Sequence, residues 1–182
     1  MKFTNAIIFA TIASSASIPD SGSLSIFRNA LASIDSGMQL HIEKTSPFQG
    51  TNSTLLGFMN EFVLSVKQST EKMLEASTLG YDDSVALKAL TKPVLLEKGR
   101  LVLNTLDETW FSIVEACDCR EIQQLFDAYG GSISDVYQAI DDRLVTYDVQ
   151  VEPKNVIRQQ YQEFQSRLSG VKHVFLNVCV DG

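Results

Sequence analysis

Few residues in this sequence break regular structure. Its 182 residues include only four prolines and ten glycines. An all-β architecture uses both residue types at its many turns, so their scarcity favours long regular elements. The length is that of one domain, and a hydrophobic content of 45% excludes a disordered chain.

Positive charge is also scarce. Lysine and arginine number 15 against 22 aspartates and glutamates, which gives a net charge of −7. No basic stripe runs along the chain. An acidic protein of this kind binds nucleic acid poorly and does not dock electrostatically on anionic lipid, so no nucleic-acid partner is expected.

A long apolar run is missing everywhere except near the N-terminus, where residues 1–16 have the pattern of a signal peptide. Lys2 supplies the positive start, residues 6–13 form the apolar run, and Ser14 and Ala16 are the small residues of a cleavage site after Ala16. The alternative is a short membrane anchor, but a spanning helix needs about 20 apolar residues. The pattern predicts a secreted protein, extracellular or held in a cell wall, with no transmembrane segment.

Cleavage there would leave residues 17–182, which we expect to form a single helical-bundle domain. This mature chain would contain three cysteines, Cys117, Cys119 and Cys179. An odd number allows at most one intramolecular bridge, and we expect it to join Cys179 to Cys117 or Cys119. The alternative is that all three stay unpaired. Asn52 begins an Asn-Ser-Thr triplet, which is a candidate glycosylation site.

Residue types that carry catalysis are sparse as well. The two histidines, His41 and His173, lack a glutamate three positions earlier, as a metal site in a helical bundle would require. No Gly-x-Ser-x-Gly turn and no phosphate-binding glycine loop occur. The sequence predicts no enzyme, no metal site and no cofactor.

What the chain does contain is apolar residues at helical spacing, which repeat by three and four. These stripes are Leu24, Phe27, Leu31, Ile34 and Met38; Leu55, Met59, Phe62, Val66 and Met73; Leu87, Leu90 and Val94; Leu103, Leu106, Trp110 and Ile113; Ile122, Phe126, Tyr129, Ile133, Val136, Ile140, Leu144 and Tyr147; and Ile157, Tyr161, Phe164, Leu168, Val171, Phe175 and Val178.

The interruptions of these stripes divide the chain into about five helices. Pro93 costs roughly 3 kcal/mol inside a helix, so we expect a kink or a break near Lys92 and a new helix from the proline. Gly80 is expected to end the second helix, and the Gly130-Gly131 pair to bend or split a later one. The predicted fold is an all-α bundle. A coiled-coil dimer is the alternative, although the many aromatic residues suit a globular core better.

The stretch from Val66 to Leu106 carries a resemblance to a known family. A helix end is followed by Leu79-Gly80-Tyr81-Asp82-Asp83, by Leu87 and Leu90, by Lys92-Pro93-Val94, and by a long helix. This order resembles the middle of the fungal hydrophobic surface-binding protein and cell-wall galactomannoprotein (antigenic mannoprotein) family. The resemblance implies a secreted or wall-associated helical bundle that binds hydrophobic surfaces or lipids, including fatty acids between its helices.

From the stripes and the resemblance together, we expect a cavity between helices that holds a fatty acid or a similar apolar ligand. Glycines and Pro93 would let the helices separate; the alternative is an ordinary filled core. Ser69 and Thr70 lie on the apolar stripe and are candidates to hold a polar head group, unless the helix edge is exposed there or they bond back to their own helix. Tyr137 and Tyr161 are further candidate donors for the head group. The expected apolar lining is Met59, Phe62, Val66, Met73, Leu90, Leu106, Phe126, Ile133, Tyr137, Ile140, Tyr161, Phe164 and Leu168.

The sequence is compatible with two other functions. The bundle could open and adsorb to hydrophobic surfaces or cell-wall polysaccharide as a structural wall protein. It could instead be a helical extracellular effector that binds a protein partner, in which case an exposed apolar patch is expected.

Overall fold

The structure, a computed structural model, describes residues 22–45, 52–116, 119–144 and 152–180. This part of the chain is helical and contains no strand, which confirms the predicted all-α class. Its elements are α2 (Gly22–Thr45), α3 (Asn52–Glu75), α4 (Tyr81–Thr91), the π-helical segment η1 (Lys92–Lys98), α5 (Gly99–Ala116), α6 (Cys119–Arg143) and α7 (Glu152–Val180).

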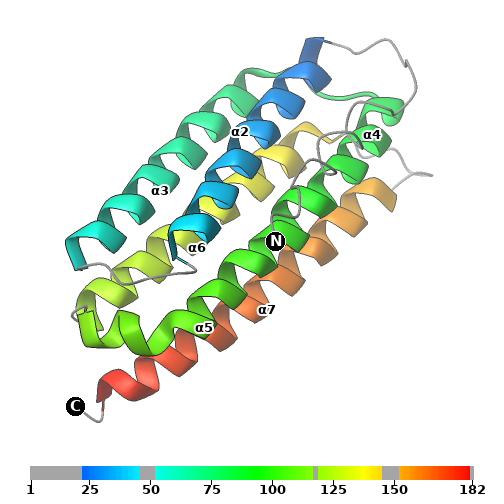
Figure 1. Cartoon of the computed structure of the whole chain (residues 1–182). Helices are drawn as coiled ribbons and strands as arrows, with labels where there is room; N and C mark the ends of the chain where they lie inside the picture. Colours follow the sequence, from blue (N-terminus) through cyan, green and yellow to red (C-terminus); the bar gives the residue numbers. More distant parts are fainter. Residues whose placement is uncertain (1–21, 46–51, 117–118, 145–151, 181–182) are drawn as a thin grey trace, which may run out of the picture.

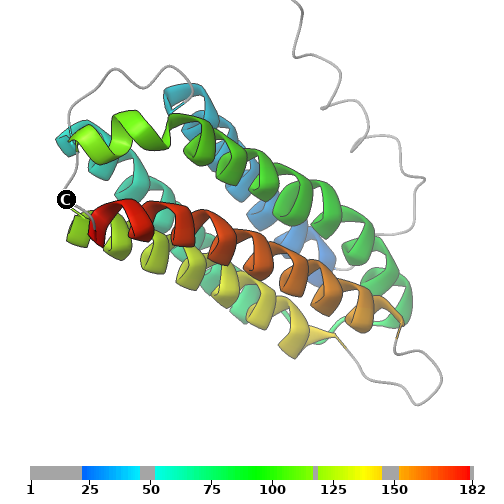
Figure 2. The same cartoon turned by 90° about the horizontal axis from the view of Figure 1, so that it is seen from below.

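The helices form five rods, because α4, η1 and α5 follow one another without a gap. The rods close a ring: α2 packs on α3, α3 on α6, α6 on α7, α7 on α5, and α5 on α2. Figure 1 shows the rods running roughly alongside one another, and Figure 2 shows the same bundle from below. The apolar core lies along the axis of this ring.

The apolar stripes explain why the ring forms. Each rod turns its stripe inward, as the spacing of three and four predicts. The largest fully buried side chains come from all five rods. They are Tyr129, Phe27, Phe164, Phe175, Leu24, Ile34, Met38, Met73, Leu79, Leu87 and Leu95.

The interruption expected near Pro93 takes the form of a change of helix type, because α4 ends at Thr91 and the π-helical segment η1 begins at Lys92. The proline lies at the start of η1, and the rod continues through it into α5. A π-helical turn is wider than an α-helical turn, which gives the ring of proline room beside the preceding turn. The hydroxyl of Thr91 donates a hydrogen bond of 3.0 Å to the carbonyl oxygen of Lys88, in the turn before the proline. A local change of helix type therefore marks the expected interruption.

The glycines also act differently from the expectation. Gly80 has an extended backbone (φ −68°, ψ 176°) and precedes α4, while α3 has already ended at Glu75. Helix α6 runs unbroken through Gly130 and Gly131. A Cβ atom on Gly130 would lie 2.5 Å from a methyl carbon of Leu168, so this glycine lets α6 and α7 approach closely.

Gly99 and Gly37 make the same kind of contact. A Cβ on Gly99 would lie 3.2 Å from the ring of Phe164, and one on Gly37 would lie 3.3 Å from the ring of Phe62. Large side chains thus occupy the space that the glycines leave. At these positions the glycines tighten the packing of the helices instead of letting them separate.

Several predictions fall on residues outside the described part: the signal peptide over residues 1–16, Cys117 and the side chain of Cys179. Cys119 forms a disulfide bond, so the three cysteines are not all unpaired. Asn52 is the first residue of α3. Within the described helices, none is both long and apolar enough to cross a membrane.

Candidate functional site

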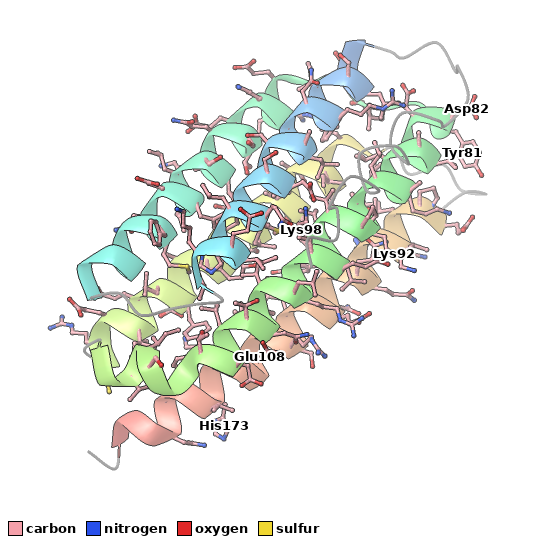
Figure 3. The ribbon with its side chains drawn as sticks, in the orientation of Figure 1. Tyr81, Asp82, Lys92, Lys98, Glu108 and His173 are labelled. Carbon is pink, nitrogen blue, oxygen red and sulfur yellow. The ribbon has the colours of Figure 1, made fainter. Side chains whose placement is uncertain are left out.

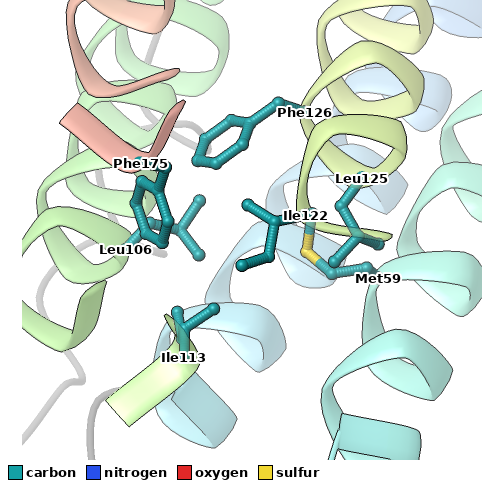
Figure 4. Close-up of a pocket in the computed structure, with 7 residues that line it drawn as sticks. All are labelled: Met59, Leu106, Ile113, Ile122, Leu125, Phe126 and Phe175. Atoms are coloured by element: carbon teal, nitrogen blue, oxygen red, sulfur yellow. The ribbon is translucent and has the colours of Figure 1, made fainter. Parts of the chain in front are cut away.

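One end of the ring contains a wholly apolar crevice, which is enclosed by α3, α5, α6 and α7 (Figure 4). This is the end at which α5 finishes and α6 begins. The crevice has a cavity volume of about 10 Å³, roughly the space that one water molecule occupies. The side chains that line it are Met59, Leu106, Ile113, Ile122, Leu125, Phe126 and Phe175.

Ring contacts hold the crevice closed. The rings of Phe126 on α6 and Phe175 on α7 lie 4.9 Å apart between centroids, in a tilted arrangement. Figure 4 shows these two rings beside each other, with Ile122 and Met59 across from them. No side chain of the lining carries a charge or a hydrogen-bonding group. A polar molecule that entered the crevice would lose its hydrogen bonds to water and find no replacement there. The crevice therefore suits only an apolar molecule.

Three residues of the predicted lining, Met59, Leu106 and Phe126, meet in this crevice. Four further lining residues were missed. Ile113, Ile122 and Phe175 belong to the predicted stripes. The position of Ile113 and Ile122 next to the connection from α5 to α6 is the sequence signal that could have placed them at this end of the bundle. The remaining predicted residues are buried elsewhere in the bundle, with two of them, Leu90 and Tyr161, only half-buried.

A column of aromatic rings continues inward from the crevice. Tyr129, one turn beyond Phe126 on α6, is fully buried. Its ring centroid lies 5.4 Å from that of Phe62 on α3 and 5.9 Å from that of Phe164 on α7. The hydroxyl group of Tyr129 has no hydrogen-bond partner among the described residues. A polar group in the middle of an apolar core is thus unsatisfied.

Tyr137, two turns further along α6, repeats this situation. It is 3% exposed, and its hydroxyl group also lacks a partner within the described part. Its ring packs against that of Tyr161 at 5.0 Å, whereas the hydroxyl of Tyr161 is hydrogen-bonded to Ser134 at 2.8 Å. Burial raises the pKa of both Tyr129 and Tyr137, so both phenols stay protonated.

Two of the four residues expected to hold a ligand head group, Ser69 and Thr70, bond to their own helix. Ser69 donates to the carbonyl oxygen of Ser65, and Thr70 to that of Val66, each over 2.9 Å. Both side chains are buried. Their hydrogens are already engaged, so in this arrangement they could only accept a further hydrogen bond.

Between α2 and α3, near the same end of the bundle, lies a shallow groove of about 130 Å³. His41 lines it and is 3% exposed, and burial lowers its pKa from 6.5 to about 4. Its Nε2 lies 3.3 Å from the hydroxyl of Thr45, while its Nδ1 has no partner in the described residues. The imidazole is therefore neutral at ordinary pH.

Charged side chains otherwise lie at the surface or in pairs. Lys98, at the end of η1, is largely buried and forms an ion pair of 2.7 Å with Asp35 on α2. Lys92, at the other end of η1, is exposed and points away from the bundle (Figure 3). The described residues contain no group of histidine, cysteine, aspartate and glutamate side chains that could hold a metal ion.

The opposite end of the bundle is held by polar bonds. The amide of Leu79 donates to the carbonyl oxygen of Arg143 over 2.8 Å, and the side chain of Arg143 donates to the carbonyl oxygen of Leu74. Asp141 on α6 forms ion pairs with two residues of α7, Arg158 at 2.9 Å and Lys154 at 3.4 Å. These bonds fasten α6 to α3 and α7.

Helical bundles that were solved with bound fatty acids share this fold. AfMP4p in complex with palmitic acid matches with a TM-score of 0.70 over 84% of this chain and 99% of that chain, at 15% identity. Ligand binding domain 2 of the Penicillium marneffei MP1 protein, in complex with arachidonic acids, matches with a TM-score of 0.74 over 87% and 97%, at 12% identity.

Ligand binding domain 1 of the same fungal protein, also complexed with arachidonic acids, matches with a TM-score of 0.69 at 11% identity. It covers 82% of this chain and 98% of that chain. No family model matches the sequence, and no curated protein matches it. At these identities the likeness establishes the fold, and it extends over nearly the whole of each compared chain.

Proposed function

We propose that this chain is a secreted or cell-wall-associated lipid-binding protein, which holds a fatty acid or a similar apolar ligand between its helices. The observation that carries the proposal is the wholly apolar crevice at one end of a closed helical ring. The shared fold with AfMP4p and the MP1 domains, which were solved with fatty acids, supports it. Secretion rests on the signal-peptide pattern of residues 1–16.

The crevice must widen to accept a lipid, because its cavity volume is only about 10 Å³. Widening separates Phe126 from Phe175 and exposes apolar lining that an acyl chain then covers again. Each buried methylene contributes about 0.8 kcal/mol, so a long chain supplies on the order of 10 kcal/mol before the costs of ordering and opening. The affinity is set by what remains after these costs are subtracted.

Native mass spectrometry of the mature chain, purified from a eukaryotic secretion host, tests this proposal. We expect a bound fatty acid or phospholipid at near-unit stoichiometry, and extraction would identify it. A protein that stays at its apo mass after incubation with palmitic and arachidonic acids would contradict lipid binding. The N-terminus of the same sample tests secretion, because it should begin after Ala16.

A second candidate function is adsorption to hydrophobic surfaces. It is favoured by four leucines on the outside of the rods, Leu40, Leu64, Leu74 and Leu101, which are 46% to 56% exposed. Adsorption to an alkyl-coated bead with loss of the near-ultraviolet circular dichroism signal would support it. A protein that keeps this signal and stays in solution would exclude it.

A further inference from the structure

Tyr129 has an unsatisfied hydroxyl group in the core of the bundle. Its side chain is fully buried between Phe62 and Phe164, and none of the described residues accepts its hydrogen bond. Buried hydroxyl groups in native proteins are nearly always hydrogen-bonded, since leaving one unpaired is costly. This group is therefore available to a partner that enters the core from outside.

Tyr129 lies directly behind the crevice. Phe126, which closes the crevice, is one turn before it on α6, and Met59, which lines the crevice, is one turn before Phe62 on α3. A ligand that widens the crevice and extends along the axis therefore meets Tyr129 as its first hydrogen-bond donor. Tyr137 follows about 12 Å further along α6, given a rise of about 1.5 Å per residue.

The surroundings of the two phenols disfavour a charged ligand group. Among the described residues, Lys98 is the one buried lysine or arginine, and it is already paired with Asp35. Burial raises the pKa of Tyr137 first, and the negative charge of Glu163 raises it further. An ionised carboxylate would be buried there without a counter-charge, at a high cost in free energy.

We propose that Tyr129, with Tyr137 behind it, is the polar anchor of the lipid site and donates a hydrogen bond to an uncharged oxygen of the ligand. Such an oxygen occurs in a fatty alcohol, an ester or a protonated fatty acid. The inference rests on the proposed lipid binding and adds the chemical class of the head group. The apolar body of the ligand then lies against the lining of the crevice and the core.

The test compares three ligands of equal chain length, 1-hexadecanol, hexadecane and palmitic acid, presented from cyclodextrin to the delipidated mature protein. The wild type should bind 1-hexadecanol more tightly than hexadecane, and at pH 7.5 at least as tightly as palmitic acid. Tyr129→Phe should weaken 1-hexadecanol threefold to tenfold, the value of one neutral hydrogen bond, and leave hexadecane unchanged. The double variant Tyr129→Phe/Tyr137→Phe should no longer distinguish the two.

The matched control is Tyr161→Phe, because the hydroxyl of Tyr161 already has Ser134 as its partner. It should not change the affinity for 1-hexadecanol. The Tyr129→Phe variant should fold at least as stably as the wild type, since it loses only an unsatisfied group, and thermal unfolding checks this.

Three results would overturn the inference, and they are distinguishable. If the wild type binds none of the three ligands, the proposed function fails and the anchor fails with it. If the wild type binds 1-hexadecanol and Tyr129→Phe binds it equally well, only the anchor fails. If palmitic acid binds more tightly than 1-hexadecanol at pH 7.5 and its affinity does not rise as the pH is lowered, the head group is bound in its charged form and the chemical class proposed here is wrong.

Discussion

The two ends of the bundle are held together by different forces. At the polar end, the Leu79–Arg143 backbone bond and the ion pairs of Asp141 fix α6 against its neighbours at distances of 2.8 to 3.4 Å. At the apolar end, the crevice side chains meet only through apolar contacts, of which the Phe126–Phe175 ring pair is the most specific. The lining of the crevice has no such directed bond, although the Lys172–Asp127 ion pair between α7 and α6 and the disulfide of Cys119 lie at the same end.

This difference decides where a ligand can enter. An apolar contact between two side chains can be exchanged for a contact with an acyl chain at little cost, because both are equally apolar. A hydrogen bond or an ion pair has no such substitute in a lipid tail, and breaking it leaves polar groups unpaired. The crevice lining is therefore the part of the bundle that can yield to a ligand, while the directed bonds at both ends keep the helices together.

The largest expected effect comes from truncating a ring in the middle of the bundle. Phe164 is fully buried, packs on Tyr129 and fills the space beside Gly99. Phe164→Ala should lower the free energy of unfolding by about 5 kcal/mol, and Phe126→Ala at the apolar end by only about 3 kcal/mol, because an end that can collapse leaves a smaller cavity. Urea denaturation of both variants measures the difference. Equal losses would mean that the apolar end is packed as rigidly as the centre.

Acid should loosen the apolar end through His41. The folded protein holds its pKa near 4, whereas the unfolded chain has the ordinary value of 6.5. As the pH falls through this window, the unfolded chain takes up a proton that the folded protein does not. The free energy of unfolding should therefore fall by about 3 kcal/mol between pH 7 and pH 4.

The variant His41→Leu should lose this pH-dependent part of the stability, and denaturation curves at pH 7, 5 and 4 would show it. His173→Gln is the control, because it removes the other histidine, which is exposed, and leaves His41 in place. A wild-type profile that matches that of His41→Leu would show that the imidazole does not titrate on unfolding.

At the polar end, the ion pairs of Asp141 should have a smaller effect. Asp141→Asn removes the charge that Arg158 and Lys154 share, and the free energy of unfolding should fall by about 1 kcal/mol at low salt. High salt should reduce this loss, because Asp141 is partly exposed. Glu152→Gln is the control: Glu152 is 67% exposed and its one ion pair among the described residues is with Lys88, so its loss should be close to zero.

The smallest expected effect is the difference in stability between alanine substitutions at two adjacent glycines of α6. Gly131 has open space around it, so Gly131→Ala should raise the free energy of unfolding by about 0.5–1 kcal/mol through helix propensity alone. Gly130→Ala should gain less or lose stability, because the new Cβ displaces a methyl group of Leu168. Equal thermal midpoints for the two variants would mean that α6 and α7 are not in close contact there.

Much of the fold could be predicted from the sequence, because apolar spacing reports which face of each helix is buried. Phe27, Ile34 and Met38 lie inside the bundle as their spacing predicts. The effect of Pro93 on its helix could not be predicted from apolar spacing. Whether a proline breaks a helix or is accommodated by a wider turn depends on what packs around it, and Val94 and Leu95 are buried beside it.

The candidate site was harder to predict than the fold. Met59, Leu106 and Phe126 were expected, but Leu125 was not, since it lies beside the stripe that contains Ile122. Periodicity shows that a residue faces inward and gives no information on its depth along the bundle axis. The unsatisfied hydroxyl of Tyr129 could not be predicted either, because a tyrosine at a stripe position is equally compatible with a hydrogen-bonded side chain.

The closed ring of rods has a consequence for timing. A molecule on the axis of the ring cannot leave sideways unless two packed helices separate along their length, so it leaves through an end. The wholly apolar crevice is the exit that we expect, because its lining side chains separate without breaking a hydrogen bond or an ion pair. If the chain holds a lipid as proposed, the release of that lipid is paced by how often this end of the protein opens. Chemically different lipids would therefore share similar residence times, even where their affinities differ.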